Sequence, residues 1–137
     1  MVNKIDLLIV EDDKDLVDTV RIILENKNFN VRTAYNGKEG YKKIEEKIPD
    51  LIILDVMMST DTEGFDLAYK LKNHTLYREI PIIMTTSFPQ KMAERGPEKF
   101  QHIMGENWPV AEFLEKPVDP DELISAIEDI LKDKNIL

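Results

Sequence analysis

Short apolar runs recur along this chain, and each of them stops at a polar residue. The run Ile5–Val10 ends at Glu11 and Asp12, and the run Leu51–Leu54 is followed by Asp55. Strands that are buried on both faces of a parallel sheet read as near-continuous apolar runs. Ligands of such sheets bind beyond the carboxyl ends of the strands. The pattern therefore predicts an α/β fold with polar side chains gathered at one edge of the sheet.

Strand and helix signals alternate along the sequence, and the chain carries no linker or internal repeat. We expect five strands, at Ile5–Val10, Asn30–Ala34, Leu51–Leu54, from Pro81 onward, and Ala111–Glu115. Helices are expected from the cap Asp13 to about Asn26, from the turn Asn36-Gly37 to about Lys47, around Leu67, Ala68 and Leu71, and from Pro120 to about Asp133. Alternation of this kind predicts a doubly wound parallel sheet with helices on both faces. Residues 1–137 are expected to form a single domain.

The connection between the fourth and fifth strands is atypical. The segment Phe88–Val110 holds three prolines, two glycines and several large apolar side chains. Prolines disfavour one continuous helix, and the apolar content exceeds that of a plain solvent loop. We expect a single helix near Glu98–Met104 within an irregular cap beside Thr86. Such a surface favours a specific protein partner or self-association into a homodimer.

The charge of the chain limits its partners. The formal net charge is −9 at pH 7, whereas nucleic acids and anionic membranes attract a cationic surface. The sequence contains no cysteine, so disulfides and thiolate metal sites are excluded. No apolar stretch approaches membrane-spanning length, and the first residues lack the apolar core of a signal peptide. A cytoplasmic protein without direct nucleic-acid or membrane binding is expected.

The acids at the strand ends suggest a magnesium site. Glu11 and Asp12 are adjacent, so they repel each other and favour a nearby cation. Mg²⁺ prefers octahedral oxygen coordination and typically takes one or two carboxylates. The alternative is an acidic helix start that complements the helix dipole. Asp13 already supplies the helix cap, however, which leaves Glu11 and Asp12 for another purpose.

The remaining strand-end residues suit phosphoryl chemistry. Asp55 follows four apolar residues, and carboxylates can act as nucleophiles that form aspartyl phosphates. Lys116 follows the fifth strand and can serve as a point charge for phosphate. A hydroxyl from the run Thr85–Ser87 can donate to a phosphoryl oxygen. Each signal is weak alone, but together they indicate a magnesium ion and a phosphoryl group at one sheet edge.

These residues stand in segments that resemble the receiver domain of two-component response regulators. The matching segments cover essentially the whole chain and read Leu8-Ile9-Val10-Glu11-Asp12-Asp13, Leu54-Asp55-Val56-Met57-Met58, Gly64-Phe65-Asp66-Leu67, Pro81-Ile82-Ile83-Met84-Thr85-Thr86 and Phe113-Leu114-Glu115-Lys116-Pro117. The resemblance implies a flavodoxin-like sheet with the strand order 2-1-3-4-5.

The resemblance also implies a role for each site residue. Asp55 resembles the phospho-acceptor, and Lys116 would pair with its phosphoryl group. Glu11 and Asp12 resemble the acidic pair that holds Mg²⁺ together with Asp55, and the backbone carbonyl of Met57 would be a further ligand. The switch pair would be Thr86, rather than Thr85, and Phe113.

The resemblance implies a signalling phospho-acceptor rather than an enzyme with a separate substrate. A sensor histidine kinase or a phosphotransfer protein would phosphorylate Asp55, and the altered face would bind a downstream protein partner.

The sequence departs from the family at Ser59 and in the loop Ser59–Glu63, which carries an insertion and the extra acids Asp61 and Glu63. Gly40 stands where alanine is usual, and it costs a helix about 1 kcal/mol relative to alanine.

Two other classes of protein remain as alternatives. A magnesium-dependent phosphohydrolase with an aspartyl nucleophile would usually carry a second acid two residues later, where this chain has Met57. A pseudo-receiver would be a pure protein-binding module. The presence of Asp12, Asp55, Thr86 and Lys116 disfavours it.

Overall fold

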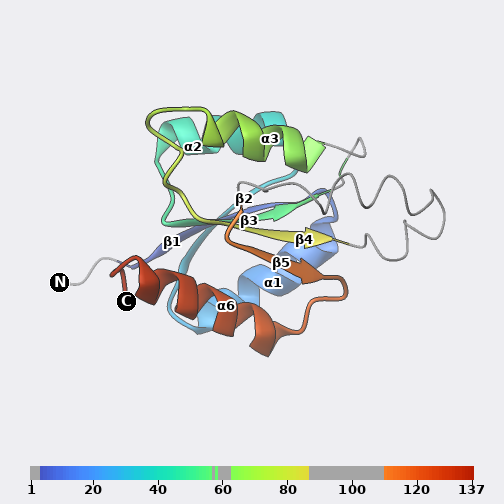
Figure 1. The fold of residues 1–137 in the computed structure, drawn as a ribbon. Helices are drawn as coiled ribbons and strands as arrows, with labels where there is room; N and C mark the ends of the chain where they lie inside the picture. The colour runs from blue at the N-terminus through green and yellow to red at the C-terminus, as the bar shows by residue number, and fades with distance from the viewer. Residues whose placement is uncertain (1–3, 57, 59–62, 87–109) are drawn as a thin grey trace, which may run out of the picture.

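A parallel sheet forms the centre of the structure, which is a computed structural model that describes residues 4–56, 58, 63–86 and 110–137. The sheet has five strands in the order β2-β1-β3-β4-β5 (Figure 1). The strands are β1 (Asp6–Val10), β2 (Asn30–Ala34), β3 (Leu51–Asp55), β4 (Ile82–Thr86) and β5 (Glu112–Glu115). Every neighbouring pair of strands is parallel, which confirms the expected fold and strand order.

The strands differ in burial because of their position in the sheet. Every residue of β1, β3 and β4 is buried, as the continuous apolar runs predict. The edge strands β2 and β5 include exposed or half-buried residues. The strand boundaries differ slightly from expectation, because Asp55 belongs to β3 whereas Ile5, Pro81 and Ala111 lie just outside their strands.

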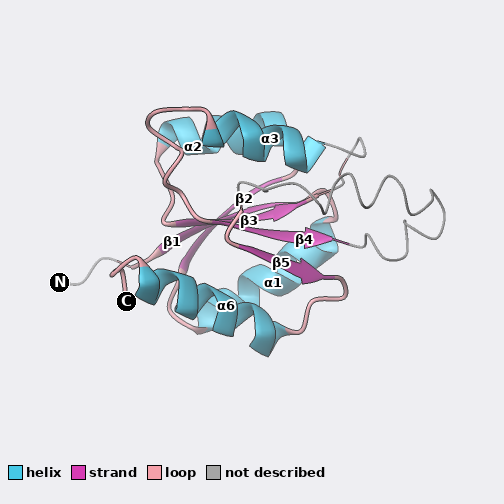
Figure 2. Cartoon of the chain, in the orientation of Figure 1, coloured by secondary structure: helices cyan, strands magenta, loops and turns pink. Residues whose placement is uncertain are grey.

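In the described part of the chain, two helices cover each face of the sheet. The helices are α1 (Lys14–Asn26), α2 (Gly37–Glu46), α3 (Glu63–Lys72) and α6 (Pro120–Asp133). Helices α2 and α3 lie on one face, and α1 and α6 lie on the other (Figure 2). The core is divided accordingly into two buried layers, one under α2 and α3 and one under α1 and α6. None of the helices in the described ranges combines the length and apolar composition that a membrane span requires.

Side-chain caps fix where several helices begin. Asp13 accepts hydrogen bonds from the amides of Asp15 and Leu16 at the start of α1, as expected. Asp119 caps α6 in the same way. Asn36, predicted to form a turn with Gly37, is instead the N-cap of α2 and accepts a hydrogen bond from the Glu39 amide at 2.7 Å. Asn is a favoured N-cap because its short side chain reaches the free amides of the first turn.

The packing of α2 explains the glycine inside that helix. A Cβ atom at Gly40 would lie 3.0 and 3.2 Å from the two Cγ atoms of Val10, near the end of β1. Gly40 therefore lets α2 approach the sheet closely, at the cost in helix propensity that glycine carries. The departure from the usual alanine has a packing reason.

An ion pair between Arg32 and the buried Asp6 lies toward the amino-terminal ends of the strands, away from Glu11, Asp12 and Asp55. The Arg32 guanidinium contacts Asp6 at 2.7 Å, and the Asp6 side chain is 4% exposed. Arg32 also donates to the carbonyl oxygens of Lys43 and Lys47 at the end of α2, at 2.8 and 2.7 Å. The amide of Asp6 donates in turn to Asp50 Oδ2 at 2.8 Å. One arginine thus joins β1, β2 and the carboxyl end of α2.

Several sequence predictions fall outside the described residues. They are the helix near Glu98–Met104 with nearly all of the Phe88–Val110 connection, the Met57 carbonyl, and residues 59–62 of the loop before α3. Val110 is described, and it packs against the core layer under α2 and α3.

Candidate metal and phosphoryl site

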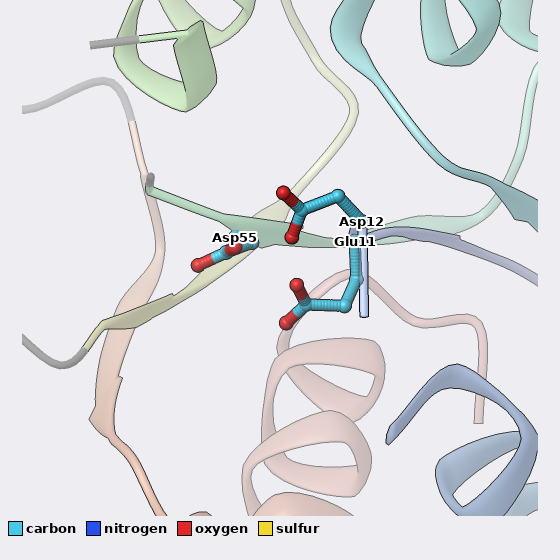
Figure 3. A group of neighbouring side chains, drawn as sticks. All are labelled: Glu11, Asp12 and Asp55. Carbon is cyan, nitrogen blue, oxygen red and sulfur yellow. The ribbon is translucent and has the colours of Figure 1, made fainter. Parts of the chain in front are cut away.

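The polar residues at the strand ends meet at one edge of the sheet, as predicted. Glu11 follows β1, Asp55 is the last residue of β3, and Lys116 follows β5. Strands β1 and β3 are direct neighbours in parallel register, which brings their carboxyl ends together. Figure 3 shows the carboxyl groups of Glu11 and Asp12 directed to the same side, with Asp55 beside them.

The three acids form a group that suits a divalent cation. One carboxylate oxygen from each of Glu11, Asp12 and Asp55 lies within 4.8 Å of the others. Opposite ligands of an octahedral Mg²⁺ lie about 4.2 Å apart, since each Mg–O distance is about 2.1 Å. The limit of 4.8 Å leaves the three oxygens near enough to share one such ion, and all-oxygen donors are those that Mg²⁺ prefers. The residues therefore fit a magnesium ion that keeps several of its waters.

Lys116 lies between two of these acids. Its Nζ is 2.5 Å from Glu11 Oε1 and 3.2 Å from Asp55 Oδ1. Glu11 and Asp55 are each 4% exposed, so the carboxylate partner of each ion pair is shielded from solvent, whereas the Lys116 side chain is 22% exposed. The peptide bond between Lys116 and Pro117 is cis. The ammonium group occupies the position from which it can contact an anionic group attached to Asp55.

Burial and neighbouring charges raise the pKa values of this cluster. The pKa of Glu11 is raised mainly by burial and further by its contact with Asp55. The pKa of Asp12 is raised by partial desolvation and by Glu11. Burial lowers the pKa of Lys116, but its hydrogen bond to Glu11 and the charge of Asp55 outweigh that effect and raise it. Glu11 and Asp12 thus resist ionisation in the folded protein without a metal, whereas Lys116 stays charged.

The raised pKa of Glu11 predicts how the stability of the metal-free protein depends on pH. Between the ordinary value of 4.5 and the raised folded value, the folded state holds a proton that the unfolded state has lost. The folded state is therefore stabilised at low pH, and this contribution is lost as the pH rises through that interval. Glu11→Gln should become progressively more stable relative to wild type across it, by about 1.4 kcal/mol for each tenfold difference in proton affinity.

Urea unfolding of wild type and Glu11→Gln at a series of pH values, with a chelator present, measures this difference directly. Comparing the two proteins cancels the titration of groups that do not interact with Glu11, whereas Asp12 and Lys116 respond to the loss of its charge. A stability difference that stays constant from pH 4 upward would contradict the raised pKa of Glu11.

An apolar cavity of about 420 Å³ adjoins the site between α1 and the start of α6. Glu11, Asp55, Thr85 and Lys116 line its polar part. The pattern of residues alone does not distinguish Thr85 from Thr86, and the resemblance favours Thr86. The register places Thr85 directly opposite Asp55 in the neighbouring strand. Thr85 is therefore a site-lining hydroxyl whose position only the strand register reveals.

Thr86 and Phe113 belong to the other face of the sheet. Met84, two residues before Thr86, packs in the core layer under α2 and α3, and Phe113 packs against the same layer. Alternation along β4 puts Thr86 on that face as well. The Phe113 ring lies 6.4 Å from the ring of Phe65 in α3. The two residues expected to form the switch pair, Thr86 and Phe113, thus lie on neighbouring strands and on the same face of the sheet.

Comparison with known proteins assigns this arrangement to a family. The sequence profile described as the response regulator receiver domain matches residues 7–128. The chain belongs to the response regulator receiver family. It is 30% identical over 130 residues to the alkaline phosphatase synthesis transcriptional regulatory protein PhoP of Bacillus subtilis, covering 95% of this chain. The chain spans 50% of the length of that relative.

Solved receiver structures share the fold. The CheY-like response regulator receiver domain protein of Methanospirillum hungatei is 28% identical, with a TM-score of 0.76 and coverage of 97% of this chain and 98% of that one. The signal receiver domain of a signal transduction histidine kinase from Syntrophus aciditrophicus is 27% identical, with a TM-score of 0.79 and coverage of 93% and 90%. These matches confirm the family and the flavodoxin-like fold expected from the sequence.

Family membership supplies the general chemistry of the site. Receiver domains are phospho-acceptors in two-component signalling rather than conventional enzymes, and they interact with sensor histidine kinases or phosphotransfer proteins. They generally bind Mg²⁺ through an acidic pocket, and this receiver carries Glu11, Asp12 and Asp55 as such a group.

Proposed function

We propose that this receiver accepts a phosphoryl group on Asp55 from the phosphohistidine of a sensor kinase or phosphotransfer protein, in a reaction that requires Mg²⁺. The main support is the half-buried Lys116 ammonium, which contacts the buried carboxylates of both Glu11 and Asp55 at the edge where the acids converge. Family membership supports the same reaction.

The proposed transfer involves one bond exchange. A carboxylate oxygen of Asp55 attacks phosphorus, the phosphorus–nitrogen bond of the phosphohistidine breaks, and the imidazole leaves with the bonding electron pair. Asp55 then carries an acyl phosphate, which water later hydrolyses to regenerate the carboxylate. Phosphoryl transfer depends mainly on alignment and on neutralisation of charge.

Each neighbouring residue has a defined part in this reaction. Glu11, Asp12, Asp55 and the Met57 carbonyl would hold Mg²⁺, which neutralises charge on the transferred phosphoryl oxygens. Lys116 would leave Asp55 and bind a phosphoryl oxygen on the new acyl phosphate. Thr86 would donate its hydroxyl to another oxygen, and Phe113 would follow it inward.

The proposed output is a change in a protein-binding face. Phosphorylation adds charge and acceptor oxygens beside Lys116, so the groups that bind them shift. The displaced surface would include β5 and the connection between β4 and β5, and it would bind a downstream protein or a second copy of the chain. We further propose that residues 1–137 act as one receiver domain in the cytoplasm, without direct contact to nucleic acid or membrane.

Intact-mass measurement separates this proposal from its alternatives. The protein is incubated with Mg²⁺ and a small-molecule phosphodonor such as acetyl phosphate, and released phosphate is followed in parallel. A phospho-adduct that decays slowly supports the receiver. Continuous turnover without an adduct would indicate a phosphohydrolase, and absence of any reaction would indicate a pseudo-receiver that only binds proteins.

Replacement of Lys116 by alanine should separate phosphorylation from its structural consequence. Lys116→Ala removes the cation that competes for Glu11 and Asp55, so Mg²⁺ affinity should stay the same or rise slightly. The phosphorylated variant should fail to show the change in amide exchange at Thr86 and Phe113 that the wild type shows. Hydrogen exchange with and without beryllofluoride measures this, and a full wild-type response in Lys116→Ala would contradict the role of Lys116.

A further inference from the structure

The first turn of α3 lies directly against the backbone that carries Asp55. The Gly64 amide donates to the carbonyl oxygen of Val56 at 3.0 Å. A Cβ atom at Gly64 would lie 2.1 Å from the carbonyl oxygen of Asp55, which only glycine avoids. The start of α3 and the end of β3 therefore form one packed unit.

Glu63, the residue before Gly64, joins this unit to α2. Its Oε1 accepts a hydrogen bond from the Gly37 amide, the first residue of α2, at 2.7 Å. A Cβ atom at Gly37 would lie 3.2 Å from Glu63 Cγ and Oε1, so glycine leaves the space that the carboxyl group fills. A carboxylate at a helix N-terminus is also favoured by the helix dipole. Glu63, which the sequence marked only as an extra acid, thus connects α3 to α2.

Helix α2 in turn contacts the strand that leads to the other two acids. Gly40 lies close against Val10, the residue immediately before Glu11. The Glu11 amide is held by the carbonyl oxygen of Ala34 at 3.0 Å. These contacts connect Asp55 to Glu11 through Gly64, Glu63, helix α2 and Val10.

We propose that Glu63 is a positioning residue for the acid cluster. Its hydrogen bond to Gly37 holds the segment after Asp55 against the helix that packs on Val10, and so sets the separation of Asp55 from Glu11 and Asp12. The length of the Glu63 side chain, rather than its charge, is the property that positions the acids. The inference rests on the proposed function, because the spacing of these acids is what Mg²⁺ binding and phosphoryl transfer require.

Two conservative variants separate reach from charge. Glu63→Asp keeps the charge but is shorter by one methylene, so it cannot reach Gly37 from the same backbone position. Glu63→Gln keeps the length and the accepting oxygen but removes the charge. Glu63→Asp should weaken Mg²⁺ binding, measured by calorimetry, and slow phosphorylation by about tenfold, which is less than the roughly hundredfold loss that a 1 Å misplacement of a reacting group can cause. Glu63→Gln should stay close to wild type in both.

Asn36→Ala is the matched control, because it removes the other side-chain cap of α2 without touching α3. It should leave Mg²⁺ affinity and phosphorylation unchanged, while amide exchange at Glu39 rises. Wild-type Mg²⁺ affinity in Glu63→Asp, equal losses in Glu63→Gln, or an equal loss in Asn36→Ala would each overturn the inference. A wild-type protein that binds Mg²⁺ but never acquires phosphate would instead refute the proposed function and leave the calorimetric comparison intact.

Discussion

Asp55→Asn should abolish phosphorylation of this receiver while leaving it folded. An amide is a poor nucleophile, and no other acid of the cluster lies at the end of β3. The variant also removes one of three carboxylates that repel one another in the metal-free protein, whereas Lys116 keeps its contact with Glu11. The free energy of unfolding without Mg²⁺ should therefore rise slightly.

The same variant should lose most of the stabilisation by metal. At a hundred times its dissociation constant, a ligand that binds only the folded state contributes about 2.7 kcal/mol. Thermal unfolding with and without Mg²⁺ tests this, and intact mass after incubation with a phosphodonor tests the phosphorylation.

Asp13→Asn provides the matched control for both measurements. Asp13 lies two residues from Glu11, but its carboxylate caps α1, and asparagine caps about as well as aspartate. This variant should accept phosphate and respond to Mg²⁺ as the wild type does. Equal phosphate incorporation in Asp55→Asn and Asp13→Asn would show that Asp55 is not the acceptor.

Arg32→Ala should destabilise the fold more than any surface substitution. It leaves the buried Asp6 carboxylate without its ion pair and releases two carbonyl oxygens at the end of α2. Removal of one partner of a buried ion pair typically costs about 3 to 5 kcal/mol, since a buried charge remains uncompensated. Urea unfolding monitored by circular dichroism measures the loss.

Arg21→Ala is the comparison for this experiment. Arg21 pairs with Asp18 at 3.2 Å, but the two side chains are 42% and 56% exposed. Exposed pairs contribute about 0 to 1 kcal/mol, so this variant should remain close to wild type. Similar losses of stability in the two variants would mean that the Arg32 network does not stabilise the fold as its burial indicates.

Local sequence patterns were sufficient for most of the secondary structure. The helices from Lys14 to Asn26 and from Pro120 to Asp133 agree with the expected bounds, because apolar periodicity and an aspartate cap mark them. The strand bounds shifted by one residue at Ile5, Asp55, Pro81 and Ala111, since pairing with the neighbouring strand decides where a ladder ends. The sequence pattern predicts a turn at Asn36, whereas Asn36 is the N-cap of α2 in the structure, because turns and N-caps favour the same residue types.

The sequence by itself determined that acids and a lysine would meet at one sheet edge, because each follows an apolar run and parallel strands share the direction of their ends. Tertiary structure alone decided which side chains touch: Lys116 reaches Glu11 across 105 positions of sequence, and Glu63 reaches Gly37. Strand register likewise decided that Thr85 lies opposite Asp55. Periodicity reports which face of an element is buried, whereas such contacts depend on how closely separate elements pack, as the glycines at 40 and 64 permit here.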